Sequence, residues 1–187
     1  MSATYPLRWL TADEIPAWRE HVAATYRTAF APPPYLRTER NVQEFLVSFE
    51  THQREPGFQF LGAFAGTPPQ LVGFAYVRRA LPGQWWYSAV APPLRKAGLG
   101  FWLEDSYQLV ELAVHLGYQR RGIGSDLLDT LIATLPGQRL LLSTSAAETP
   151  AARLYAARGW QTLLPHFNFP GVSRPYRILG RDADPTD

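Results

Sequence analysis

Two arginines and two closely spaced glycines lie between two apolar runs, in the segment Gln119–Ser125 (QRRGIGS). The run before this segment alternates like a strand and the run after it repeats with a helical period, so the glycines fall where a helix begins. The first amides of a helix have no partner within it, and the helix dipole adds partial positive charge there. Because glycine has no Cβ, an anion can approach those amides closely. The pattern predicts a phosphate site, and with Arg120 and Arg121 beside it a diphosphate is the favoured ligand.

Two common phosphate motifs do not match this segment. The chain contains no G-x-x-x-x-G-K-[ST] string, and the dinucleotide fingerprint would need a glycine where the chain has Leu127. The remaining string, Q-R-R-G-I-G, resembles the Q/R-x-x-G-x-G/A signature of GNAT-type N-acetyltransferases, whose cofactor is acetyl-CoA. The resemblance implies that the bound diphosphate is that of acetyl-CoA.

The resemblance covers about residues 107–162. ELAVHLGYQRRGIGSDLL resembles the strand, turn and helix of the family's first cofactor segment. ETPAARLYAARGW resembles the second segment, with Tyr155, Gly159 and Trp160 in the matching order. Glu148 departs from the pattern, because many relatives carry there an asparagine that bonds the pantetheine arm. We expect this glutamate to cap the following helix, and we do not assign it to the cofactor site.

The resemblance also implies a mechanism, in which a neutral amine attacks the thioester, a tetrahedral oxyanion forms and coenzyme A thiolate leaves. Backbone groups of Leu112, Ala113 and Val114 would hold the pantetheine arm, and an amide there would stabilise the oxyanion. Tyr155 would be the general acid that protonates the thiolate; a packed helix tyrosine is the alternative. The diphosphate would be held by Gln119, Arg120, Arg121, Gly122, Ile123, Gly124 and Ser125. For the two arginines the alternative is solvated surface charge.

Glu111 is the candidate general base. It is the one charged residue inside the apolar run SYQLVELAV, which we predict to be a central strand. Burial raises the pKa of a carboxyl group toward neutrality, where it can accept a proton directly or through water. A buried pair with an arginine is the alternative. Glu104 and Asp105 are weaker candidates for holding a cationic substrate.

In GNAT-type enzymes the acceptor pocket is built from the first two helices and the connections between strands, so the resemblance implies that about residues 11–56 and 81–105 form it here. The second of these segments fits neither a helical nor a strand period, so we expect a long loop, either functional or a cover over a sheet edge. Its aromatic residues would form a wall for an apolar or cationic acceptor, or belong to the core or a dimer interface: Trp85, Trp86, Tyr87, Phe101 and Trp102.

The elements that must position these residues follow from hydrophobic periodicity and turn residues. We predict strands near 5–10, 106–114, 139–145, 160–169 and 175–181, and a hairpin over 57–80 with its turn at Gly-Thr-Pro-Pro. Helices are predicted over 11–30, 40–53, 123–135 and 149–159. The order indicates an α/β (α+β) fold: a mixed, GNAT-like central sheet of about seven strands, with helices on both faces and a splay at the cofactor site. We expect residues 1–187 to be a single domain.

Composition narrows the function classes. The chain has no cysteine, and its four histidines do not form an H-E-x-x-H pair, so we expect no disulfide and no metal site. The formal net charge is only +2, and no stretch approaches about 18 continuous apolar residues. We expect a cytoplasmic protein with a small-molecule or peptide amine acceptor and neither a nucleic acid nor a membrane partner. A homodimer stays open.

Two other functions remain compatible with this reading of the sequence. The first is a non-catalytic module that binds or senses acyl-CoA on the same fold. The second is an acyltransferase that uses another acyl-CoA donor. Turnover by variants of Tyr155 and Glu111 separates an enzyme from a sensor, and a panel of acyl-CoAs separates the donors.

Overall fold

The structure is a computed structural model that describes residues 5–135 and 137–182. These residues fall into two compact units, and each unit is built from two separate segments of the chain. The first unit contains the residues up to Arg78 together with Glu111–Thr134. The second contains Arg79–Val110 together with the residues from Leu135 onward. The prediction of a single domain stays a prediction.

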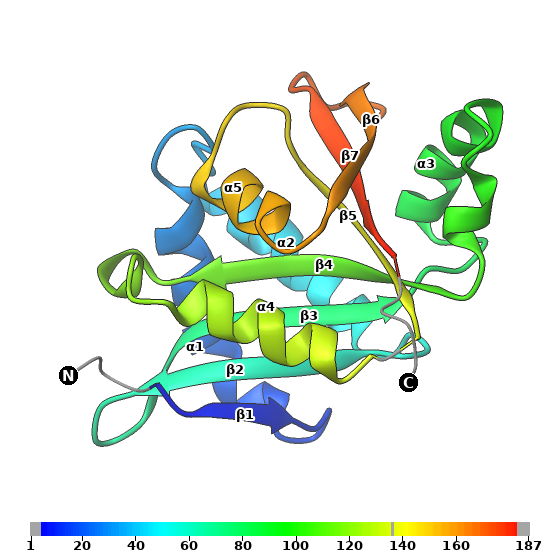
Figure 1. Cartoon of the computed structure of the whole chain (residues 1–187). Coiled ribbons are helices and arrows are strands. Elements are labelled where there is room, and N and C mark those ends of the chain that lie inside the picture. The colour runs from blue at the N-terminus through cyan, green and yellow to red at the C-terminus, as the bar shows by residue number, and fades with distance from the viewer. Residues whose placement is uncertain (1–4, 136, 183–187) are drawn as a thin grey trace. The chain divides into compact units, whose positions relative to one another are not determined.

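The sheet of the first unit has the order β1-β2-β3-β4 (Figure 1). It consists of β1 (Leu7–Leu10), β2 (Gln59–Ala65), β3 (Gln70–Arg79) and the last residues of β4 (Ser106–Val114). The last residue of β3, Arg79, already belongs to the second unit. β1 and β2 pair antiparallel, as do β2 and β3. Beyond β4, the amide of His115 donates to the carbonyl of Val72 on β3 at 2.9 Å. The predicted hairpin is confirmed, and its turn begins at Gly66, whose φ of +83° favours glycine.

Helices lie on both faces of this sheet: α1 (Ile15–Phe30) and α2 (Glu39–His52) on one, α4 (Ile123–Ala133) on the other (Figure 1). The alternation of side chains along β3 explains this arrangement. Phe74 and Tyr76 pack on the phenylalanines of α2, with ring centroids 6.1 Å from Phe45 and 5.2 Å from Phe49 respectively. Gly73, which precedes Phe74 and so faces the other side of the sheet, lies against α4.

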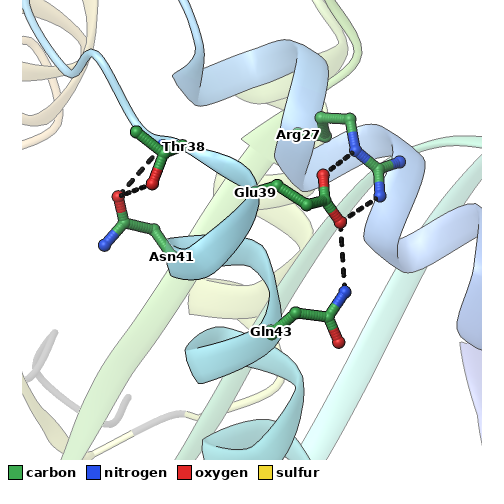
Figure 2. Close-up of polar contacts among 5 residues, drawn as sticks. All are labelled: Arg27, Thr38, Glu39, Asn41 and Gln43. Carbon is green, nitrogen blue, oxygen red and sulfur yellow. Dashed lines mark hydrogen bonds and ion pairs between the residues drawn. The ribbon is translucent and has the colours of Figure 1, made fainter.

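The start of α2 is fixed by two sets of polar contacts (Figure 2). Thr38 donates from its amide to Oδ1 of Asn41 at 3.0 Å, within a capping box. Glu39, the first helical residue, accepts two hydrogen bonds from Arg27 of α1, at 2.8 and 2.9 Å, and one from Gln43. The Arg27 guanidinium lowers the pKa of Glu39 to about 2. These contacts join the two helices on either side of the connection at residues 31–38.

The second unit has the strand order β4-β5-β7-β6, with β5 (Arg139–Ser145), β6 (Gln161–Phe167) and β7 (Tyr176–Arg181). β4 and β5 pair in parallel from Ser106 to Gln108, whereas β7 pairs antiparallel with both β5 and β6. The unit also contains α3 (Trp85–Lys96), a 3₁₀ turn η1 (Gly100–Leu103) and α5 (Pro150–Ala156). Thr149 caps α5, because its Oγ1 accepts from the amide of Ala152 at 3.0 Å.

The prediction of a long loop at residues 81–105 is wrong, because most of this segment is helical. Pro92 and Pro93 lie inside α3, where proline normally indicates a helix end. The helix forms nevertheless, since its buried residues recur at helical spacing and pack into the core of this unit: Trp86, Tyr87, Val90, Ala91 and Leu94. Burial of this face outweighs the low helix propensity of the two prolines.

The predicted fold class is confirmed: the described residues form a seven-stranded mixed sheet with five α-helices. β4, β5 and α4 begin at the residues that the pattern indicated, although α1 begins at Ile15 rather than Thr11. The amide of Thr11 still bonds Oε2 of Glu14 at 2.9 Å, but the helix follows this contact instead of including it. Among the described helices, none has both the length and the apolar character needed to cross a membrane.

Candidate active site

The predicted phosphate site lies in the first unit, where the chain turns from β4 into α4. β4 ends at Val114, a 3₁₀ turn η2 (Leu116–Tyr118) follows, and α4 begins at Ile123. Gly122, at the N-cap, has a φ of +88°, which a side chain would strain. The space on its Cβ side is open: apart from the adjacent residues, the one atom of the described residues within 4 Å of that position is Oδ2 of Asp126 at 3.9 Å. The first amides of α4 have no partner within the helix, so this is the end of α4 at which an anion would bind.

The first turn of α4 is held against the sheet by close packing. Ile123 and Leu127 are buried beneath the helix. A Cβ added to Gly73 of β3 would meet Cγ2 of Ile123 at 3.0 Å and Cδ1 of Leu127 at 3.2 Å. The absence of a side chain at Gly73 thus allows α4 to approach the sheet, and it sets the distance between the first turn of α4 and β3.

Gln119 is bonded to the end of the strand before it. Its side-chain Nε2 donates to the carbonyl of Val114 at 2.9 Å. We expected this amide to face the diphosphate and the Val114 backbone to face the pantetheine arm, and in this structure the two groups bond each other. The contact joins the end of β4 to the turn that precedes α4. The segment predicted to bind the pantetheine arm is therefore bonded to the segment predicted to bind the diphosphate.

The two arginines of the signature differ in their surroundings. Arg120 is exposed and has a left-handed backbone, with a φ of 62°. Arg121 is also exposed, but its Nη1 donates to Oη of Tyr5 at 3.1 Å and its guanidinium lies 5.3 Å from the ring centroid of Tyr118. The expectation that these residues bind the cofactor stays a prediction.

Glu111, the candidate base, lies on β4 in the first unit and is half-buried. Removal of its carboxyl group from water raises the pKa to about 8, although the charge of Arg37 and a hydrogen bond from the Leu112 amide act in the opposite direction. Glu111 would therefore exchange a proton in the neutral to mildly alkaline range. The predicted direction of the pKa shift agrees with the structure, and the catalytic role stays a prediction.

A partly buried polar pair that sequence analysis missed lies on the same unit. The Tyr76 hydroxyl on β3 and Nδ1 of His52 on α2 are 3.0 Å apart. Burial, followed by the charge of Glu111, raises the pKa of Tyr76 well above its usual value. Burial and the charge of Arg78 lower the pKa of His52 to about 4, so the imidazole is neutral at physiological pH. The sequence signals nearest to this contact are the alternating aromatic residues of β3 and the apolar face of α2, and neither indicates a hydrogen bond.

Tyr155, the candidate acid, lies on α5 in the second unit. It is 7% exposed and packs against Trp160, with ring centroids 5.6 Å apart. Glu148 does not cap this helix, which corrects our expectation: its carboxylate accepts a hydrogen bond from Arg177 of β7 at 2.8 Å, and Thr149 is the cap. The ion pair joins the start of α5 to the neighbouring strand.

The predicted aromatic wall is mostly core. Trp86, Tyr87 and Trp102 are buried in the hydrophobic cluster of the second unit. The indole of Trp86 donates to Oγ of Ser143 at 3.2 Å. Trp85 is 60% exposed and stacks on Phe169, with ring centroids 5.1 Å apart. Phe101 is the second of the five that is exposed.

Residues 5–135 and 137–182 contain no group of three or more His, Cys, Asp or Glu side chains arranged to hold a metal ion. The expectation that no metal takes part stays a prediction.

Comparison with known proteins identifies relatives of this chain. The model of the acetyltransferase (GNAT) family matches residues 15–160. A GCN5-like protein acetyltransferase of Mycobacterium tuberculosis is 31% identical over 119 residues, which are 59% of this chain and 58% of that protein. The matched region thus spans little more than half of the curated relative.

Solved structures share the fold at low sequence identity. The ribosomal-protein-S18-alanine N-acetyltransferase from Escherichia coli has a TM-score of 0.65 and 18% identity, over 98% of this chain and 97% of that one. The PaiA N-acetyltransferase from Thermoplasma acidophilum, solved in complex with coenzyme A, has a TM-score of 0.60 and 14% identity, over 96% and 99% respectively.

Proposed function

The chain belongs to the acetyltransferase (GNAT) family and is an acyltransferase, and on this premise we propose that it transfers the acetyl group of acetyl-CoA directly to a primary amine. The acceptor is a small molecule or a peptide. The observation that carries this proposal is the open mouth of α4, with glycine at the N-cap and two arginines beside it. The proposal includes the cytoplasmic location expected from the sequence.

Three groups of backbone amides and side chains bind the cofactor in this proposal. The amides of Gly122, Ile123, Gly124 and Ser125 hold the diphosphate, where the helix dipole favours negative charge. Arg120 and Arg121 add charge at the rim. Backbone groups of Leu112 and Ala113 bind the pantetheine arm, and an amide of this strand donates to the oxyanion.

The proton transfers are assigned to Glu111 and Tyr155. The amine nitrogen forms a bond to the thioester carbonyl carbon, and Glu111 takes the proton that the nitrogen loses, directly or through water. The C–S bond then breaks, and Tyr155 donates its proton to the leaving thiolate. Because the pKa of Glu111 is about 8, its basic form prevails only above that pH. The rate therefore increases as the pH rises through about 8.

The relatives favour a protein or peptide amine as the first acceptor to test. The Mycobacterium tuberculosis relative is described as a protein acetyltransferase, and the Escherichia coli enzyme acts on an alanine of ribosomal protein S18. A screen with acetyl-CoA and thiol release as the readout covers peptide N-termini, lysine peptides, polyamines, aminoglycosides and amino acids.

The screen also decides between this function and the two alternatives. Transfer to at least one amine, with turnover decreased in Glu111→Gln and cofactor affinity retained, supports the proposal. Tight acetyl-CoA binding without transfer to any amine would instead indicate a sensor. A larger thermal shift with another acyl-CoA than with acetyl-CoA would indicate a different donor.

A further inference from the structure

Arg121 is held in place by two tyrosines. Its Nη1 donates to Oη of Tyr5 at 3.1 Å, and the guanidinium lies 5.3 Å from the ring centroid of Tyr118. The two tyrosine rings contact each other edge to face, with centroids 6.0 Å apart. All three residues belong to the first unit. A solvent-exposed arginine normally samples many rotamers, so this arrangement preorganises a long side chain that is otherwise mobile.

Both partners of Arg121 are neutral. Tyr5 provides a hydroxyl oxygen and Tyr118 an aromatic face, and neither cancels the positive charge. Within residues 5–135 and 137–182, none of the ion pairs involves Arg121, whereas Arg27, Arg40 and Arg139 each pair with a carboxylate. The charge of Arg121 is therefore oriented and remains available to an anion.

The position of Arg121 relative to the strands indicates which anionic group it would bind. The carbonyl of Pro6 accepts from the amide of Phe64 at 3.0 Å, so the chain next to Tyr5 runs along β2 as it enters β1. In the order β1-β2-β3-β4, this is the side of the sheet opposite to β4. Through Tyr5, Arg121 is therefore bonded to the segment that enters β1, at the edge of this sheet opposite to β4.

Coenzyme A carries a second phosphate beyond its diphosphate, on the ribose 3′-oxygen at the end farthest from the thioester. If the diphosphate lies at the mouth of α4 and the thioester arm along β4, as the proposed function has it, this group would lie beyond the diphosphate, on the side away from β4. We propose that Arg121, held by Tyr5 and Tyr118, binds the 3′-phosphate and makes the protein select coenzyme A over its 3′-dephospho form. This inference rests on the proposed function.

Calorimetric titration with coenzyme A and with 3′-dephospho-coenzyme A tests the assignment. We expect the wild-type protein to bind coenzyme A about tenfold more tightly, since an exposed charge-assisted pair is worth about one hydrogen bond to a charged group. Arg121→Gln should weaken coenzyme A binding by about that factor more than it weakens binding of the dephospho form, and should thereby remove the preference. A smaller loss is expected for the dephospho form, because the charge of Arg121 also lies at the rim of the diphosphate site. Tyr5→Phe should remove part of the preference, because the arginine loses its hydrogen-bonded partner.

Arg120→Gln is the matched control, because it removes the same charge one residue away. It should weaken binding of both ligands by a similar factor, as expected for a residue near the diphosphate. Equal wild-type affinity for the two ligands, or an equal loss for both in Arg121→Gln, would overturn the assignment and leave the proposed function intact. Failure of the wild-type protein to bind either ligand would overturn the proposed function itself.

Discussion

Substitution of Gly73 by alanine should weaken cofactor binding although this residue lies beneath the site and not in it. The new Cβ would lie 3.0 Å from Cγ2 of Ile123, 3.2 Å from Cδ1 of Leu127 and 3.3 Å from the carbonyl oxygen of Ala113. Ile123 is the first residue of α4, between the two glycines of the signature. Because Ile123 is buried, we expect the contact to be relieved by an outward movement of the first turn of α4.

The size of the effect follows from these distances. Carbon atoms pack best at about 3.5–4.0 Å, so α4 must shift outward by about 0.5 Å at Ile123. Overpacking of this kind costs about 1–3 kcal/mol of stability, which corresponds to a decrease in Tm of about 2–12 °C. If the displaced turn loses one amide bond to the diphosphate, worth about 1.5–3 kcal/mol, Kd for acetyl-CoA increases by about 10- to 100-fold.

Calorimetry with acetyl-CoA at a temperature where the variant is fully folded measures this increase. Gly62→Ala is the matched control on the neighbouring strand, since its Cβ would meet Cδ1 of Leu71 at 2.6 Å and the ring of Phe64 at 3.0 Å. This variant should also be less stable, but its affinity for acetyl-CoA should be unchanged. An equal change of affinity in both variants, or wild-type affinity in Gly73→Ala, would refute the argument that Gly73 fixes the first turn of α4.

Three further predictions concern single groups. Tyr155→Phe should lower kcat by about tenfold or more with acetyl-CoA affinity retained, and unchanged steady-state turnover would remove this hydroxyl from the mechanism. The folded-state pKa of Glu111 is raised from 4.5 to about 8, so its contribution to stability decreases as the pH rises through this window. The Tm of Glu111→Gln relative to wild type should therefore increase from about pH 4.5 to about pH 8, and a constant difference would show that the carboxyl group is not desolvated. Asp126→Asn should tighten acetyl-CoA binding a few-fold at low salt, because the carboxylate lies beside Gly122 at the mouth of α4. Binding by this variant that is weaker than binding by the wild type at every salt concentration would contradict an anion site there.

The sequence was sufficient where local pattern and final structure agree. β4 and α4 follow directly from strand alternation and helical spacing, and the glycine signature lies between them as expected. The α3 helix was missed because Pro92 and Pro93 are strong local indicators of a helix end, whereas the burial that overrides them is a property of the folded unit.

The polar contacts of the site could not be predicted for a similar reason. The bond between Tyr76 and His52 joins residues 24 positions apart on a strand and a helix, and no spacing rule connects them. The contact between Arg121 and Tyr5 joins residues 116 positions apart. The pKa of Glu111, in contrast, was predicted in direction because one charge in an apolar strand must be desolvated wherever the strand is packed.

A crystal structure of the protein with coenzyme A bound would test the central claim most directly. We predict that the diphosphate oxygens lie within hydrogen-bond distance of the backbone amides of residues 122–125, at the mouth of α4. A well-ordered coenzyme A whose diphosphate lies elsewhere, with these amides bonded only to water, would contradict the account.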